Sequence, residues 1–149
     1  MTKAGRKTIA AGLVAFTITS GSALAAGAKK LPQSGPVDQD SGASVELVVL
    51  KKDGAPKSVK GIKIKDLLAD CDVGERRITL KLFGAAKVED GVIGRDYGSD
   101  DQTLIRIKGT VAANGKSVSA QIKGAKDSAV PISGAGNCAI PKFTFTTSR

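Results

Sequence analysis

Residues 90–101, DGVIGRDYGSDD, bring four aspartates together with the chain's only tyrosine. Calcium takes about six to eight oxygen ligands, so Asp90, Asp96, Asp100 and Asp101 have the composition of a calcium-binding loop. Their spacing does not match an EF-hand, which places acids at alternate positions and a glutamate at the end of the loop. A glycine-rich connection explains the same residues, and we expect neither a metal nor another cofactor.

The middle of this stretch is a candidate recognition loop. Arg95, Asp96 and Tyr97 place a planar cation, an acid and an aromatic ring in succession. These residue types are common where one protein binds another, and loops often carry such contacts. Two interpretations stay open: a plain connection, and a loop presented to a partner.

A second candidate site is a face of basic residues on expected strands. Its members are Lys63, Lys65, Lys81, Arg106 and Lys108. Such a face would suit an anionic glycan or another polyanion. Platforms for single-stranded nucleic acids interleave aromatic rings, which are absent here, so we expect no specific nucleic-acid partner. The competing interpretation is a solvated sheet face, on which lysines improve solubility and discourage edge pairing.

The chain contains no histidine. It therefore lacks the most common general base and the most common transition-metal ligand, and Ser-His-Asp and Cys-His catalytic groups are excluded. A pair of carboxylates could still hydrolyse a glycosidic bond, but sugar sites usually need aromatic platforms and only 3% of the residues are aromatic. We expect a protein that is not an enzyme.

The N-terminal segment has the pattern of a secretory signal peptide, because basic residues precede an uncharged stretch over residues 8–24. Small residues at Ala23 and Ala25 predict cleavage after Ala25. Removing residues 1–25 leaves 20 Lys and Arg against 14 Asp and Glu, a net charge of +6. The competing interpretation, a retained membrane anchor, is weakened by the Thr and Ser residues within the stretch. We expect a secreted or periplasmic protein with no membrane span after cleavage.

Two cysteines, Cys71 and Cys138, lie in the expected exported part. An even count in an oxidising compartment predicts a disulfide. The acids on either side of Cys71, Asp70 and Asp72, would suppress a reactive thiolate, so we interpret the bond as structural. It would lock the C-terminal strand onto the rest of the domain.

Short β-branched segments follow one another from residue 44 onward. RITLKLF at 77–83 alternates apolar and polar residues with period two, as a half-buried strand does. SVELVVL at 44–50, TLIRIKGTV at 103–111 and SVSAQI at 117–122 are further candidates. Between the last two, Asn114-Gly115 predicts a hairpin. The final candidate is IPKFTFTT at 140–147.

One stretch, SVKGIKIKDLLADCDVG, is ambiguous. Residues 58–65 could form a strand, and the apolar spacing over 64–71 also suits a short helix. We expect a strand that leads into one or two helical turns.

These segments predict a mainly β fold: a single small antiparallel β-sandwich or barrel-like domain with one disulfide and at most one short helix. The expected organisation is a signal peptide at 1–25, a flexible leader at 26–43 and a β-rich domain at 44–149. The leader is inferred from its two prolines, three glycines and lack of apolar periodicity.

In composition, the expected exported β-rich domain with one disulfide and few aromatics resembles bacterial adhesin and pilin subunits. KFTFTT at 142–147 suits the alternating final strand of pilin-like subunits, although the tyrosine expected near that end is missing. The resemblance implies a binding or structural module of the cell envelope. Its partner would be an envelope or extracellular protein or an anionic glycan, and it could self-associate through a strand edge. The chain also resembles small exported inhibitors, which would present residues 90–101 to a target enzyme.

Overall fold

The computed structural model describes residues 28–99, 102–125 and 129–149. Every regular element among them is a β-strand, and the strands form one antiparallel sheet. The mainly β fold class is therefore confirmed. No helix in the described residues has the length and apolarity that a membrane span requires. The expected signal peptide lies outside the described residues.

Eleven strands make up the sheet. In chain order they are β2 (Ala28–Val37), β3 (Asp40–Lys52), β4 (Ala55–Cys71), β5 (Gly74–Leu82), β6 (Ala86–Lys87), β7 (Val92–Ser99), β8 (Gln102–Val111), β9 (Ser117–Gly124), β10 (Val130–Ile132), β11 (Gly136–Ala139) and β12 (Phe143–Ser148). Their spatial order is β10-β11-β4-β3-β2-β12-β9-β8-β7, and β5 and β6 pair with β4 beside this path.

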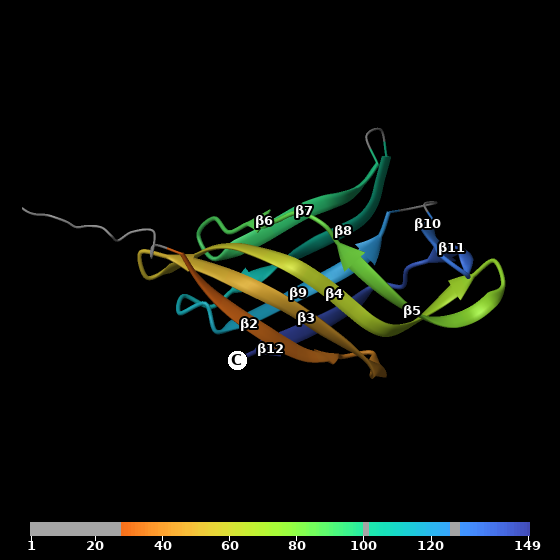
Figure 1. Ribbon diagram of the computed structural model, residues 1–149, viewed down its shortest axis with the longest axis horizontal. Helices are drawn as coiled ribbons and strands as arrows, with labels where there is room; N and C mark the ends of the chain where they lie inside the picture. The colour runs from red at the N-terminus through yellow and green to blue at the C-terminus, as the bar shows by residue number, and fades with distance from the viewer. Residues whose placement is uncertain (1–27, 100–101, 126–128) are drawn as a thin grey trace, which may run out of the picture.

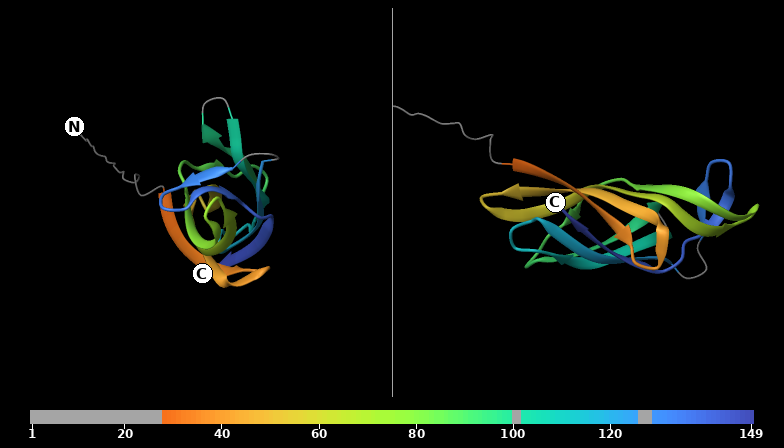
Figure 2. Two further views of the ribbon diagram at one scale, coloured as in Figure 1. Left: turned by 90° about the vertical axis from the view of Figure 1, so that its right-hand side faces the viewer. Right: turned by 90° about the horizontal axis from the view of Figure 1, so that it is seen from below.

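The sheet consists of two halves that curve around a common interior (Figures 1 and 2). One half is the meander β2-β3-β4-β5, and the other is β12-β9-β8-β7. They meet where β2 pairs with β12. At this junction a Cβ on Gly35 would lie 1.9 Å from the carbonyl oxygen of Thr146, so the two backbones can approach only because Gly35 has no side chain.

Alternating apolar side chains from both halves fill the interior. In β3, Val45, Leu47 and Val49 are buried, and in β12 Phe143 and Phe145 are buried. The half-exposed or exposed residues between them face solvent. The strands that the sequence predicts at 44–50, 77–83, 103–111 and 117–122 are thus present, with boundaries that differ by a few residues.

Turn residues at one end of the molecule set the register of three hairpins. Asp53-Gly54 and Asp90-Gly91 have positive φ at both positions, as the two-residue type I′ turn requires. Gly115 also has a positive φ, and the predicted hairpin at Asn114-Gly115 joins β8 to β9. All three turns lie at the same end in Figure 1.

The prediction of a flexible leader at 26–43 is wrong from residue 28 onward, because β2 and the start of β3 occupy this segment. The alternation was hidden because Gln33 and Gly35 take inward positions between Leu31 and Val37. Gln33 is buried but satisfied: its side chain accepts a hydrogen bond from Thr147 Oγ1 and donates one to the Gly115 carbonyl. A polar residue can therefore stand in the core here.

The prediction of helical turns at 64–71 is also wrong, because β4 runs unbroken to Cys71. The pairing register shifts between Ile64 and Leu67, where Asp66 has a φ of 57°. Before this bulge the even-numbered residues Ile62 and Ile64 face the core. After it the odd-numbered residues Leu67, Ala69 and Cys71 face the core. The resulting three-residue spacing resembles that of a helix although the backbone is extended.

The predicted disulfide between Cys71 and Cys138 is confirmed. The two residues are direct cross-strand partners, so the bond fastens the β10–β11 hairpin to the end of β4. Asp72 supports the same contact, because its backbone N–H donates to Asn137 and its carboxylate accepts from the Asn137 N–H.

Candidate functional site

Residues 90–101 do not form the expected loop. Val92–Ser99 is strand β7, paired with β8, and within the described part of this stretch the turn at Asp90-Gly91 is the connection. Asp100 and Asp101 lie outside the described residues. No group of three or more metal-ligating side chains occurs within the part of the chain that the structure describes.

Tyr97 points into the core rather than toward a partner. Its side chain pairs across the strands with Ile105 and is only 7% exposed. Its hydroxyl has no hydrogen-bond partner among the described residues. Burial raises the pKa of Tyr97, against a smaller opposing effect from the charge of Arg95. Tyr97 is therefore a core residue that carries an unsatisfied polar atom.

Arg95 connects β7 to the segment between β5 and β6. Its guanidinium donates a hydrogen bond to the Ala85 carbonyl and lies 4.9 Å from the centroid of the Tyr97 ring. Gly84 lies against this guanidinium, since a Cβ there would be 2.6 Å from Arg95 Nη2, and its φ of 100° favours glycine at this position. Arg95 thus joins the two halves of the sheet on the side where β7 and the β5–β6 segment are not paired as strands.

Asp96 faces the opposite side of β7. Its carboxylate pairs with Arg106 on β8 at 2.7 Å. The hydrogen bond from Arg106 is the main cause of the lowered pKa of Asp96. Each of the three predicted recognition residues is therefore engaged within the chain, while their contact with a partner remains a prediction.

The predicted basic face is distributed over two strand pairs. Lys63 on β4 stands opposite Lys81 on β5, whereas Arg106 and Lys108 lie on β8. Two members are already ion-paired: Arg106 with Asp96, and Lys65 with Glu46 at 2.9 Å. The structure does not bring all five residues to neighbouring strands, and polyanion binding by them remains a prediction.

One edge of β5 is unpaired among the described strands. The strand pairs with β4 from Gly74 to Leu82, and no described strand pairs with its other edge. Ile78, Leu80 and Leu82 are buried, so the strand is fixed in the core while its second edge stays open.

An ion pair holds the beginning of β5 in place. Arg77 Nη1 contacts both carboxylate oxygens of Asp40, at 2.7 and 2.8 Å, and donates to the Asp66 carbonyl at 2.8 Å. The Asp40 carboxylate also accepts the backbone N–H groups of Leu68 and Gly42. The hydrogen bond from Arg77 is the largest cause of the lowered pKa of Asp40. This cluster positions β5 at the bulge of β4.

Two hollows follow the open edge of β5. The first, of about 220 Å³, lies between the C-terminal end of β5 and the β7–β8 pair. Its lining is Lys81, Leu82, Phe83, Tyr97, Gly98, Leu104, Ile105 and Val130. Phe83, at the rim of this hollow, is 80% exposed, which is unusual for so large an apolar residue.

The second hollow, of about 460 Å³, lies at the other end of the strand. Arg76 to Thr79 form one wall, and Pro131 to Ala135 of the β10–β11 hairpin form the other. The disulfide that fastens this hairpin thereby also positions one wall of the hollow. Together the two hollows make a broken groove along β5.

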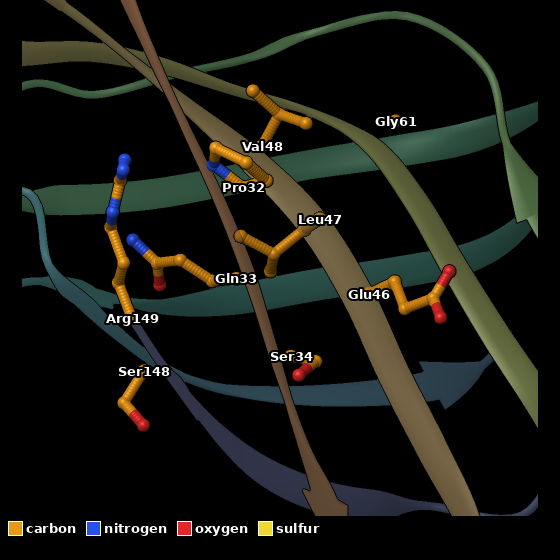
Figure 3. Close-up of a pocket in the computed structure, with 9 residues that line it drawn as sticks. All are labelled: Pro32, Gln33, Ser34, Glu46, Leu47, Val48, Gly61, Ser148 and Arg149. Atoms are coloured by element: carbon orange, nitrogen blue, oxygen red, sulfur yellow. The ribbon is translucent and has the colours of Figure 1, made fainter.

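Another hollow lies elsewhere, on the outer side of β2 and β3, and has a volume of about 530 Å³ (Figure 3). Its two charged side chains, Glu46 and Arg149, lie on opposite sides of it in Figure 3. Glu46 is tied to Lys65, whose hydrogen bond and charge lower the pKa of the carboxyl. Since the charged groups do not converge, this arrangement does not form an acid–base pair.

Comparisons with protein-family models, with curated proteins and with solved structures each found no match.

The open edge and the exposed Phe83 are the site features that sequence reasoning missed. The alternation at 77–83 indicates a strand but does not say whether one or both edges are paired. The signal that could have been used is Phe83 itself: it directly follows the buried Leu82, so period two places it on the outer face.

Proposed function

We propose that this protein is an exported, non-enzymatic binding or structural module of the bacterial cell envelope, and that it binds an extended segment of another protein along the open edge of β5. An unpaired edge offers backbone donors and acceptors at fixed spacing, and an added strand satisfies them. The observation that supports the proposal is the nine-residue open edge of Gly74–Leu82, which is about 30 Å long.

The hollows indicate what the bound segment would look like. Apolar residues dominate the lining near Leu82, so an apolar side chain of the segment would be buried there beside Phe83. Near the start of β5, Arg76 favours an acidic or polar side chain. A segment with an acidic residue at one end and an apolar anchor at the other would suit both positions.

Charges on β5 would also limit indiscriminate pairing. Lys81 stands opposite Lys63 across the paired edge, and β5 itself carries Arg76, Arg77 and Lys81 against the single acid Glu75, so two neighbouring copies of β5 would repel each other. Natural sheets use lysine in this way to keep edges from pairing with one another. The edge is therefore better suited to an acidic partner than to a second copy of itself.

The alternative function, an inhibitor that inserts residues 90–101 into an enzyme, has less support. Val92–Ser99 is a paired strand, and Arg95 and Asp96 already bind groups of this chain. Their release for a target would cost these contacts.

Photo-crosslinking in the native envelope tests the proposal. A benzoyl-phenylalanine residue at Thr79, which is exposed on β5, should form one discrete adduct with another protein. The same analogue at Ser119 is the matched control, because Ser119 is exposed on β9 between two paired strands. The adduct at position 79 should weaken severalfold when Phe83→Asp is added, since Phe83 is on the surface and its replacement leaves the core intact.

Mapping the adduct by mass spectrometry completes the test. The proposal expects a single extended segment of the partner with an apolar residue near Phe83. Equal crosslinking at Thr79 and Ser119 would show that β5 is not the binding edge. An adduct whose yield is unchanged by Phe83→Asp would show the same.

A further inference from the structure

The β3–β4, β6–β7 and β8–β9 turns lie at one end of the molecule (Figure 1), and the residues of this end are strongly basic. We call it the hairpin end. Its basic residues are Lys29, Lys30, Lys51, Lys52, Lys57, Lys87, Lys116 and Arg149. The acids on the same turns are Asp53, Glu89 and Asp90.

Tertiary contacts gather these cations from distant parts of the sequence. Lys29 on β2 stands directly opposite Lys51 on β3. The stem of Lys51 lies against the β8–β9 turn, where a Cβ on Gly115 would be 3.0 Å from its Cδ atom. The backbone N–H of Arg149 donates to the carbonyl of Lys116 beside that turn. Three separate regions of the chain thus contribute to one surface.

These cations are largely without intramolecular counterions. Among the described residues, Lys87 alone of the eight has a salt bridge, to Glu89 at 3.4 Å. Like charges directly opposite in a sheet are destabilising, as with Lys29 and Lys51. The arrangement costs stability in the isolated domain, which an external anionic partner would offset.

The opposite end of the molecule is not basic in the same way. Its acids are Asp38, Asp40, Asp66, Asp70, Asp72 and Glu75, and its basic residues are Lys65, Arg76, Arg77, Lys123 and Lys142. The excess of positive charge is therefore concentrated at the hairpin end, and an extended anionic surface would attract this end more strongly than the other.

The shape and chain connection of the hairpin end favour a membrane surface. Its cations are spread over turns and strand ends, and none of the three hollows described above is lined by more than one of them. The chain also enters the domain here: Ala28 begins β2 only a few residues after the uncharged stretch 8–24. We expect residues 1–25 to be a signal peptide, and such a segment holds this end close to the bilayer during export until it is cleaved.

We propose that the hairpin end docks on a membrane surface through the phosphate groups of anionic phospholipids. Each lysine or arginine near such a surface contributes about 1 kcal/mol, and the attraction falls off within a Debye length. Docking by this end leaves the open edge of β5 extending away from the membrane, where it remains accessible.

Vesicle co-sedimentation tests the inference with the exported protein as the cell processes it. Vesicles of equal parts phosphatidylglycerol and phosphatidylcholine should pellet the protein at low salt and release it at high salt. Vesicles of phosphatidylcholine alone should not pellet it. The triple variant Lys29→Gln/Lys30→Gln/Lys52→Gln should bind about a hundredfold more weakly, since three cations near the surface are lost.

The matched control removes the same charge from elsewhere on the surface. Arg76→Gln/Lys123→Gln/Lys142→Gln changes three exposed basic residues on β5, on β9 and just before β12, and its binding should stay within severalfold of the wild type. All six side chains are exposed, so thermal melts should confirm that both variants fold. Equal loss in both triples, or no binding to anionic vesicles, would overturn the proposal. So would pelleting without vesicles, or binding only to a soluble anionic glycan such as heparin.

Discussion

Consecutive residues of β7 perform different tasks because a strand alternates its faces. Tyr97 is buried, Asp96 is outside in an ion pair with Arg106, and Arg95 reaches across the margin of the sheet to Ala85. Their residue types suggested a binding loop, but the same types can serve internal contacts. What distinguishes the two cases is whether each side chain already has a partner within the fold.

Replacing Tyr97 with phenylalanine should stabilise the protein or leave its stability unchanged. The hydroxyl is buried without a hydrogen-bond partner among the described residues. Its removal relieves a desolvation cost of about 1 kcal/mol while the ring still packs against the core. Urea denaturation of the wild type and Tyr97→Phe checks this expectation. A loss of more than about 1 kcal/mol would show that the hydroxyl has a partner in solution.

Asp40 should make stability depend on pH. Its pKa in the folded protein lies below the ordinary value of 3.8, chiefly because of the hydrogen bond from Arg77. A lowered pKa contributes stability that is present above the unfolded value and is lost as pH falls through the folded value. Asp40→Asn should therefore cost about 1 kcal/mol at neutral pH, a modest amount because Arg77 is half exposed.

Unfolding curves at neutral pH and at about pH 3 measure this effect. The difference between wild type and Asp40→Asn should shrink at the lower pH. A difference that stays constant would mean that the ion pair with Arg77 does not contribute.

At the scale of elements, the junction of β2 and β12 joins the two halves of the sheet. Only two residue pairs define its register, Val37 with Phe145 and Ser34 with Ser148. The close backbone approach at Gly35 lies between them. A segment with two prolines can form a strand here because tertiary contacts, rather than local propensity, stabilise it.

Gly35→Ala should be strongly destabilising. Its Cβ would lie 1.9 Å from a backbone oxygen, which cannot move aside without separating the strands. We expect a loss of about 3 kcal/mol or more in the free energy of unfolding. Gly94→Ala is the control, because its Cβ would meet its nearest neighbour at 3.9 Å. Similar stabilities for the two variants would contradict the described junction.

At the scale of the whole molecule, the open edge and the charge distribution are separate features of one curved sheet. The edge of β5 would set the direction in which a bound strand runs. The positive charge of the hairpin end would select an anionic surface. Neither feature belongs to one segment, because the groove has walls from β5, β7, β8 and the β10–β11 hairpin.

Reducing the disulfide should destabilise the whole domain. The bond links residues separated by 67 positions, and the chain-entropy model gives roughly 4 kcal/mol for a loop of that length. Thermal melts with and without reductant should differ by many degrees, and Cys71→Ser/Cys138→Ser should behave like the reduced protein. An unchanged melt would show that the bond does not stabilise the fold.

The sequence by itself determined the features that depend on local patterns. Period-two alternation identified the strand at 77–83, and the Asn114-Gly115 dipeptide identified a hairpin. The even cysteine count identified the disulfide between Cys71 and Cys138. Each of these follows from a few adjacent residues or, for the disulfide, from there being only two cysteines to pair. None of them requires knowing which residues are neighbours in space.

Only the tertiary structure decided which edges and faces remain free. The bulge at Asp66 imitates helical spacing, Gln33 is an inward residue because Thr147 satisfies it, and Tyr97 is buried because β7 pairs with β8. The open edge of β5 and the gathered lysines of the hairpin end likewise arise from contacts between residues far apart in the chain. Strand pairing is a long-range interaction, and a local pattern is the same whether or not a partner lies beside it.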